Sequence, residues 1–308
     1  MADFTVADIA HFEDQNIAGI LEDFSLVAPA LSVLPAISCP GTTFAQPRVT
    51  ALGSNSAFRS ANVGKATSAP SITSDTVTLK YLDGSYQLDI QVAESAHAGP
   101  QAAVAMAQKY GLIDVIQKLE KVVLFGDDAF YGDIAGFEGI WGNIDSSMDI
   151  DAGGEAEGEQ TTAIVIAKNE INVILGHDAQ LSQSEIVKQM AYDASGNPFY
   201  AYVQAIGSWA AVSGIYGAKT ACRIYNCDGT KPLTDDLMAE AILAFPAYSR
   251  KDLVVVTSRA GVQQLRQSRT ATNATGAPAP MPAESFGVPV IMTDAISGEM
   301  EVFDPDAT

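Results

Sequence analysis

The stretch from Phe58 to Val92, FRSANVGKATSAPSITSDTVTLKYLDGSYQLDIQV, decides how the chain is organised. Its first half is polar and rich in small residues, and its second half alternates like an exposed strand. Together with the preceding segment QPRVTALGSNSAF, it predicts two strands around a tip rich in glycine, serine and alanine. Such a ribbon has too little apolar material for a core of its own, so it must lie on something else.

The ribbon is positively charged in a negatively charged protein. Between Arg48 and Lys80 there are four basic residues and one acidic residue, Asp75, whereas the whole chain has a net charge of −20. Residues 122–167 contain ten acidic residues and no basic one. Opposite charges fix register and partner choice between copies. We expect Arg59, Lys65 and Lys80 to contact another subunit, with these acidic complements: Asp127, Asp128, Asp133, Asp145, Asp149 and Asp151.

The composition excludes several classes of protein. The 308 residues, 47% of them hydrophobic, allow a sizeable core. The excess of acidic residues argues against wrapping a nucleic acid, which needs clustered lysine and arginine. The first residues do not resemble a signal peptide, and no apolar run approaches the roughly 18 residues that a membrane span needs. Cys39, Cys222 and Cys227 predict reduced, buried thiols in a protein made in a cytoplasm.

Residues 1–46 are predicted to form an arm. Pro29 and Pro35 interrupt an apolar stretch and keep it extended, because proline blocks helix continuation. An extended apolar arm must lie on the same subunit or on a neighbouring one, and we expect it to lie across an adjacent subunit and to bury its leucine and valine side chains there. A short helical pattern precedes this stretch, with apolar residues at Ile17, Ile20, Leu21 and Phe24.

The clearest helix is predicted over residues 99–125. Pro100 suits its first turn, and a helix of this length would run roughly 35–40 Å, which makes it a spine. Gly111 weakens it, so packing must hold it. Its apolar face is Leu112, Val115, Ile116, Leu119 and Val123.

The remaining chain predicts a mixture of strands and helices. Residues 145–160 read as an acidic loop, and about Ile164 to Asn226 read as antiparallel strands. A helix capped by Thr234, a buried strand LVVVTS, a second helix RAGVQQLRQS and a last strand GVPVIMTDAI follow.

No motif predicts catalysis, a cofactor or a bound metal. NVGKAT lacks the first glycine and the final serine or threonine of a phosphate loop. Asp149, Asp151 and Gly154 match three positions of a calcium loop, but Gln160 stands where a bidentate glutamate is needed. The three histidines have no metal-binding spacing. We therefore predict no catalytic, cofactor-binding or metal-binding residue.

The order of the parts resembles a major capsid protein of tailed double-stranded DNA phages with the Hong Kong 97-type fold. GILEDFSLVAPALSVLPAIS is similar to the N-terminal arm, Val49–Val92 resembles the extended E-loop, and GPQAAVAMAQKYGLIDVIQKLEKVVLFGD resembles the spine helix of the P-domain. GFEGIWGNI is similar to the glycine-rich segment after that helix. The final part of the chain resembles that of one subgroup of these proteins. The segments that carry this resemblance are RIYNCDGTKPLTDDLMAEAI, LVVVTSRAGVQQLRQS and FGVPVIMTDAI.

The resemblance implies an α+β fold with an arm (1–46), an E-loop β-hairpin (47–92), a P-domain (93–230) and an A-domain-like unit (231–308). It implies self-assembly into pentamers and hexamers of an icosahedral shell that encloses double-stranded DNA without reading its sequence. Lys65 stands where the founding member has a crosslinking lysine. No scaffolding segment precedes the arm, so we expect a separate scaffolding protein or none.

Further implied partners are a portal protein and a decoration or cement protein. The protein would be found in the virion after assembly in the bacterial cytoplasm, and no membrane is involved. The alternatives are an encapsulin-type shell around cargo enzymes, a soluble α/β enzyme, and a host-binding or decoration protein.

Overall fold

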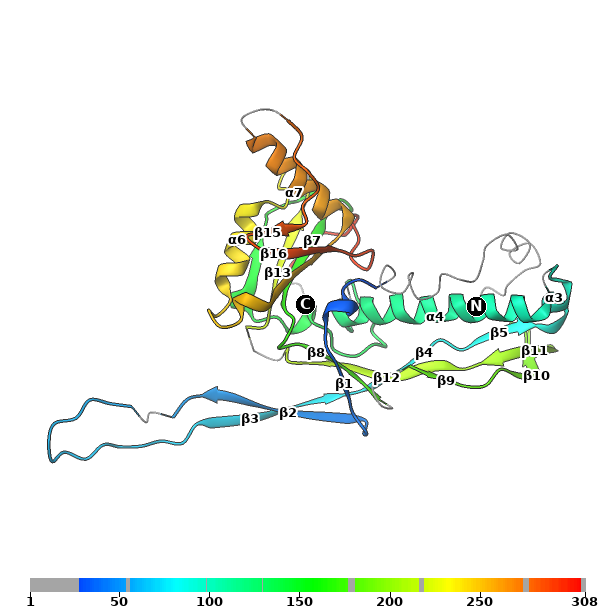
Figure 1. Cartoon of the computed structure of the whole chain (residues 1–308), viewed down its shortest axis with the longest axis horizontal. Helices are drawn as coiled ribbons and strands as arrows, with labels where there is room; N and C mark the ends of the chain where they lie inside the picture. Colours follow the sequence, from blue (N-terminus) through cyan, green and yellow to red (C-terminus); the bar gives the residue numbers. More distant parts are fainter. Residues whose placement is uncertain are drawn as a thin grey trace.

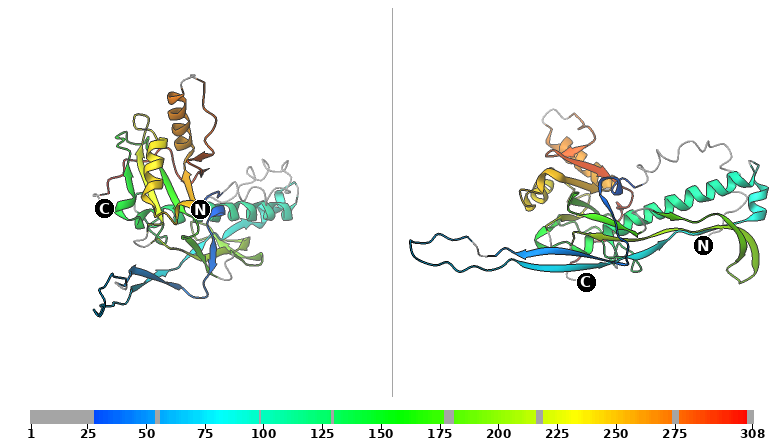
Figure 2. Two further views of the ribbon diagram at one scale, coloured as in Figure 1. Left: turned by 60° about the vertical axis from the view of Figure 1, so that its left-hand side comes forward. Right: turned by 60° about the horizontal axis from the view of Figure 1, so that its bottom comes forward.

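The computed structural model describes residues 28–53, 56–97, 99–128, 130–176, 181–215, 219–273 and 277–305. The molecule is elongated. A long helix lies along a layer of strands, and a second unit stands at one end of this layer (Figure 1). A ribbon projects from the body in the direction away from the N-terminal end of the helix. The ribbon projects from the body in the two other views as well (Figure 2).

The spine helix α4 (Pro100–Phe125) confirms the predicted helix. Pro100 occupies its first turn, where the missing N–H costs nothing. At its other end Gly126 has φ 70°, and its N–H donates to the Val122 carbonyl at 2.8 Å. The 26 residues give a length of about 39 Å. The predicted apolar face is buried except for Leu112, which is half-buried.

Two sheets lie along this helix. In the first, the strand order is β1 (Ala36–Ser38), β8 (Asn172–Leu175), β12 (Ile206–Ser213) and β4 (Lys80–Asp83), with β9 (Ser182–Gln183) also pairing with β12. In the second, the order is β10 (Val187–Tyr192), β11 (Pro198–Gln204) and β5 (Tyr86–Asp89). The short helix α3 (Ile90–Ser95) connects β5 to α4, and its first turn is capped by Asp89, which accepts from Gln91 N–H. Gly111 of α4 leaves room for Tyr86, whose ring would lie 3.3 Å from an added Cβ.

The second unit is built on one mixed sheet. Its order is β15 (Glu284–Ser285), β16 (Val288–Met292), β14 (Leu253–Thr257), β7 (Thr161–Ala167), β13 (Ala221–Cys227) and β6 (Asp149–Asp151). Helices α6 (Asp235–Ala244) and α7 (Arg259–Thr272) accompany it, as Figure 1 shows. Thr234 caps α6 by accepting from Leu237 N–H, as predicted. The final helix–strand–helix and the last strand are confirmed too.

The sheet topology corrects the domain boundary placed at residue 231. Strands β7 and β13 pair with each other, and β7 also pairs with β14, so both belong to the unit predicted to begin at 231. All seven residues of each strand are buried, because each strand lies inside the sheet. The chain therefore enters this unit twice. The acidic segment is corrected as well, since β6 occupies part of the loop predicted over 145–160.

Both ends of the ribbon lie earlier in the chain than predicted. Strands β2 (Thr43–Ala51) and β3 (Ser71–Thr78) form it, so it begins inside the predicted arm and ends at Thr78. The segment after Thr78 turns into β4 and β5, which pair with the strands along the spine helix. Residues Ile90–Val92, predicted to be strand, are helical because Asp89 caps α3.

Short 3-10 turns complete the description. They are η2 (Leu31–Val33), η3 (Trp141–Asn143), η4 (Ser146–Met148) and η5 (Arg250–Asp252).

Candidate assembly surfaces

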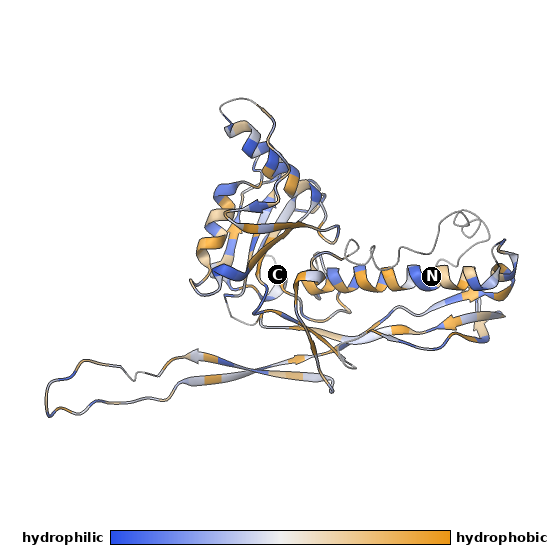
Figure 3. Ribbon diagram, in the orientation of Figure 1, coloured by the Kyte–Doolittle hydropathy of each residue, from blue (hydrophilic) through white to orange (hydrophobic). Residues whose placement is uncertain are grey.

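The ribbon has almost no core. The first part of β2 alternates between exposed and half-buried residues, and β3 is exposed except for the half-buried Asp75 and the buried Val77. Beyond the strands, every described residue from 56 to 70 is exposed except Lys65, which is half-buried. Figure 3 shows hydrophobic stretches interspersed with hydrophilic ones along this projection. Its exposed large apolar residues are Val49, Leu52, Phe58, Val63 and Ile72.

An isolated two-stranded hairpin has only marginal stability in water unless another surface supports it. The exposed apolar residues of the ribbon have no such surface within the described part of the subunit. Phe58 is exposed to the full extent of a free side chain (109%). These exposed apolar side chains make the ribbon a candidate contact surface.

The basic residues of the ribbon have different surroundings. Arg48 pairs with Asp75 on the facing strand, with Nε and Oδ2 2.9 Å apart, so its charge is neutralised within the ribbon. Arg59 folds back at the tip and donates from Nη1 to the Val63 carbonyl at 3.1 Å. Lys80 lies not at the tip but on β4, opposite Ala210 of β12. Arg59 and Lys65 therefore carry the positive charge of the tip.

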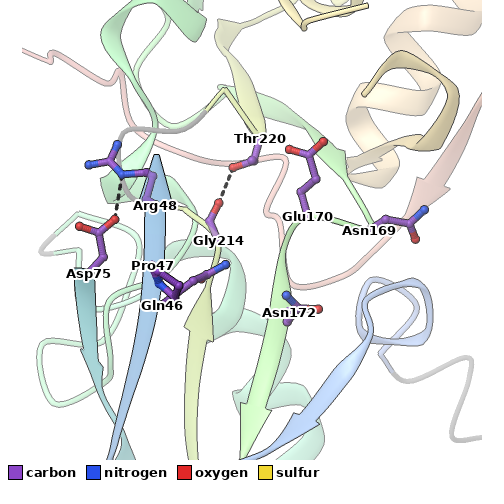
Figure 4. Close-up of a pocket in the computed structure, with 9 residues that line it drawn as sticks. All are labelled: Gln46, Pro47, Arg48, Asp75, Asn169, Glu170, Asn172, Gly214 and Thr220. Carbon is purple, nitrogen blue, oxygen red and sulfur yellow. Dashed lines mark hydrogen bonds and ion pairs between the residues drawn. The ribbon is translucent and has the colours of Figure 1, made fainter. Parts of the chain in front are cut away.

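A polar cavity of about 330 Å³ lies at the root of the ribbon. Figure 4 shows the Arg48–Asp75 ion pair on one wall and the hydrogen bond from Thr220 to the Gly214 carbonyl on another. Glu170 on the far wall accepts from Ser249 Oγ at 2.5 Å. No histidine or cysteine is among the described residues that line this cavity. The ion pair and the hydrogen bond across its walls are typical of a structural joint.

The acidic candidates are mostly engaged within the subunit. Asp149 forms an ion pair with Arg223, and Asp133 forms one with Lys118. The hydrogen bonds from Lys118 and from Ala135 N–H lower the pKa of Asp133. Asp128 accepts from the N–H groups of Phe130 and Tyr131.

Three further acidic residues complete this set. Asp151 accepts from Gly153 N–H and from Asn226 Nδ2. Asp145 caps η4 by accepting from Ser147, and these hydrogen bonds lower its pKa. Asp127 is exposed. Asp149 is thus unsuited to pairing with a neighbouring ribbon, while the exposed Asp127 and the half-buried Asp145 remain candidates.

The described part of the arm lies on its own chain. Ala30 and Leu34 are buried in the main hydrophobic core. Strand β1 pairs in parallel with β8 of the same subunit, and the Cys39 N–H continues the pairing by donating to Leu175 O. For residues 28–39 the expected docking across an adjacent subunit is therefore wrong. The helical pattern at residues 17–24 lies outside the described residues.

An apolar groove of about 390 Å³ runs between this arm, α4 and β8. The arm contributes Leu31 and Leu34, the helix contributes Ile116, and β8 contributes Val173 and Leu175. Only one polar residue, Gln183, is among the described residues that line it.

The remaining residues predicted for chemistry have structural roles. In the described ranges, no group of three or more histidine, cysteine, aspartate and glutamate residues could hold a metal ion. Cys39, Cys222 and Cys227 are free and buried, as predicted. Burial raises the pKa of Cys222 and of Cys227 to about 12. Among the described helices, none has the length and apolarity that crossing a membrane requires.

Sequence reasoning missed three buried charged residues, Glu120, Arg223 and Asp228. Arg223 lies on β13, and its guanidinium stacks on Trp141 and Phe303. Glu120 lies on the buried face of α4, 1% exposed. Its position three residues before Val123, inside the apolar pattern of the spine helix, was the available signal.

An arm, a projecting ribbon, a spine helix over strands and a separate mixed-sheet unit together make up the architecture of the chain. A chain of bacteriophage Epsilon15 is similar to this one with a TM-score of 0.63 and 15% sequence identity, covering 98% of each chain. The chain thus has the Hong Kong 97-type fold. No protein-family model and no curated protein matches the sequence.

Two other solved structures are more distant. The procapsid of bacteriophage JBD30 gives a TM-score of 0.43 at 12% identity, covering 95% of this chain and all of the other. The holo-SrpI encapsulin complex from Synechococcus elongatus gives 0.45 at 6% identity, covering 74% and 97%. The fold assignment does not rest on either.

Proposed function

We propose that the protein is a major capsid protein that assembles into pentamers and hexamers of an icosahedral shell around double-stranded DNA. One observation carries the proposal: a ribbon with exposed apolar residues and almost no core projects from the body. The surface that supports the ribbon would belong to a second copy of the chain. Such head-to-tail contacts between identical subunits can close into rings. The Hong Kong 97-type fold supports this proposal.

The charge of the chain fits a container. A net charge of −20 repels DNA phosphates, so the genome would be held by confinement and counterions rather than by the wall. Scaffolding, portal and decoration proteins are the partners that such a shell would use. The virion would be its final location, after assembly in the bacterial cytoplasm. A lumen lined with lysine and arginine would contradict the charge argument.

Electron microscopy of the purified full-length chain tests the proposal. We expect closed shells from the wild type and from Phe58→Leu, and few or none from Phe58→Ser. Burying a phenylalanine stabilises by roughly 1.5–3 kcal/mol at each contact, so its loss weakens assembly by about tenfold or more per contact. Because Phe58 is fully exposed, both variants should unfold in urea at the wild-type midpoint. A wild type that stays monomeric at high concentration would contradict the proposal.

An encapsulin-type shell is the second candidate. The observation that favours it is the apolar groove between the arm, α4 and β8, which has the size and character for a cargo peptide. Particles purified from the native source discriminate the two functions. Long duplex DNA inside supports the capsid, and enzyme molecules inside support the encapsulin.

A further inference from the structure

Glu120 lies where three parts of the chain meet. Its side chain is 1% exposed on α4. Its Oε1 accepts a hydrogen bond of 2.7 Å from the backbone N–H of Ala30, directly before the arm turn η2. The side chain of Thr293, which follows β16, also hydrogen-bonds to this carboxyl group. A single carboxyl group thus connects the arm, the spine helix and the mixed-sheet unit.

The groups around Glu120 offer it no positive partner. No ion pair of Glu120 occurs within the described ranges, and the arm residues 28–38 include no charged side chain. From the mixed-sheet unit, Asp294 faces it and adds negative charge. Asp294 itself is exposed and lies 3.8 Å from Arg259.

The basic neighbours on α4 point to other groups. Lys118 pairs with Asp133. Lys121 lines a surface cavity together with Glu299 and Glu301. The charge of a deprotonated Glu120 is therefore stabilised by two hydrogen bonds and by no cation in the described part of the chain.

A carboxyl group in this position prefers to be neutral. Burial disfavours the charged form and raises the pKa of Glu120, and Asp294 acts in the same direction. The hydrogen bonds from Ala30 and Thr293 oppose this shift. The neutral acid can accept the Ala30 N–H as well, without the cost of a buried charge.

We propose that Glu120 is a proton-controlled latch, which holds the arm and the mixed-sheet unit on the spine helix when protonated and loosens them when charged. A permanent connection would need only glutamine, which accepts the same hydrogen bond and never ionises. The latch needs only contacts within one subunit. Its role in assembly, which is to fix the arm in place before or after neighbouring subunits bind, rests on the proposed function.

The direction of the pH effect follows from the raised pKa. The unfolded or released glutamate ionises around its ordinary value, 4.5, whereas the latched group keeps its proton to higher pH. The contribution of the latch is complete below the ordinary value and is lost as the pH rises through the raised one. One proton changes the latching equilibrium by at most tenfold per pH unit.

Hydrogen exchange on the unassembled full-length chain tests the latch. Protection factors of amides in residues 28–38, which already correct for intrinsic rates, are measured between pH 4.0 and 8.5, so that the range begins below the ordinary pKa of glutamate. We expect protection in the wild type to fall with rising pH, by up to tenfold per unit, and to stay level in Glu120→Gln. Glu94→Gln, an exposed change on α3, is the matched control and should keep the wild-type slope.

Two results would overturn the latch. One is a pH-independent protection of residues 28–38 in the wild type, which needs no variant to fold. The other is a Glu120→Gln protein with the wild-type slope. Glu120→Ala removes the acceptor and should lower protection of Ala30 at every pH, and unchanged protection would also refute the link. Because these measurements use subunits, they are independent of whether shells form.

Discussion

Asp149 and Arg223 form a bidentate ion pair between the edge strand β6 and its neighbour β13, with Nε–Oδ1 at 2.7 Å and Nη2–Oδ2 at 2.8 Å. The third nitrogen, Nη1, donates to the Trp141 carbonyl at 3.0 Å. The guanidinium lies 4.8 Å from the centre of the Trp141 ring and 4.7 Å from that of Phe303. One arginine thus joins the sheet edge, the segment after the spine helix and the C-terminal segment.

The first prediction is that Asp149→Asn destabilises the subunit strongly. The side chains of Arg223 and Asp149 are only 9% and 14% exposed, so the variant leaves a largely buried cation without its partner. Removing one member of such a pair costs about 3–5 kcal/mol. Urea unfolding followed by circular dichroism measures this loss. Lys251→Ala, which removes an exposed pair of 3.8 Å, should change stability by less than about 0.5 kcal/mol. A loss below about 1 kcal/mol for Asp149→Asn would show that the pair is not structurally important.

The second prediction concerns the turn that ends the spine helix. Gly126 and Gly139 approach so closely that a Cβ on Gly139 would lie 2.3 Å from Gly126 N. Gly139→Ala must therefore push the glycine-rich segment off the helix end, at a cost of about 1–3 kcal/mol or more. Gly142→Ala, three residues on, meets nothing within 4 Å and is the matched control.

The same urea measurements check this comparison. Gly142→Ala should leave the unfolding midpoint within the error of the wild type. If the two variants unfold at the same midpoint, the close contact between Gly126 and Gly139 is not required by the fold.

Local patterns predicted most of the elements, because their signals lie within a few residues. The spine helix follows from Pro100 and its apolar repeat, and α6 follows from the Thr234 cap. The domain boundary was wrong because sheet membership depends on pairing between distant strands, such as β7 with β14. The helix at Ile90 was missed because the alternation before it suggested a continuing strand, and the Asp89 cap overrode it.

The candidate surfaces were only partly predictable for a similar reason. Composition identifies the ribbon as a segment without a core, and the structure agrees at Phe58 and Ile72. Charge counting cannot tell which charges are already paired within the subunit. Arg48 finds Asp75 across the ribbon, and Asp149 finds Arg223, which is 74 residues away in sequence.

The third prediction tests the charge of the ribbon tip. Arg59→Glu combined with Lys65→Glu should impair shell formation and leave the helical circular dichroism signal unchanged, because both residues lie on the projecting tip. Lys231→Glu, an exposed reversal elsewhere, is the control. Light scattering and electron microscopy report the yield of shells. Normal yield from the double variant would refute charge matching between the tip and a neighbouring copy.

The fourth prediction is an alkaline loss of stability caused by two buried thiols. Burial raises the pKa of Cys222 and Cys227 from 9.0 to about 12, so the unfolded chain releases these protons at lower pH than the native one. The stabilisation is complete below pH 9 and is lost as the pH rises toward 12. Two protons give a slope of at most about 2.7 kcal/mol per pH unit. Tyr86, whose pKa burial raises to about 12, adds to the effect above pH 10.

Urea midpoints at pH 8, 9.5 and 11 measure this decline, and a thiol reagent provides an independent check. At pH 8.5 the native protein should react far more slowly at Cys222 and Cys227 than the urea-unfolded chain does, because the thiolate is the reactive form and is scarce in the native state. Mass spectrometry assigns the modified residues. Rapid modification of either cysteine in the native subunit would show that the core between the mixed sheet and α6 opens readily.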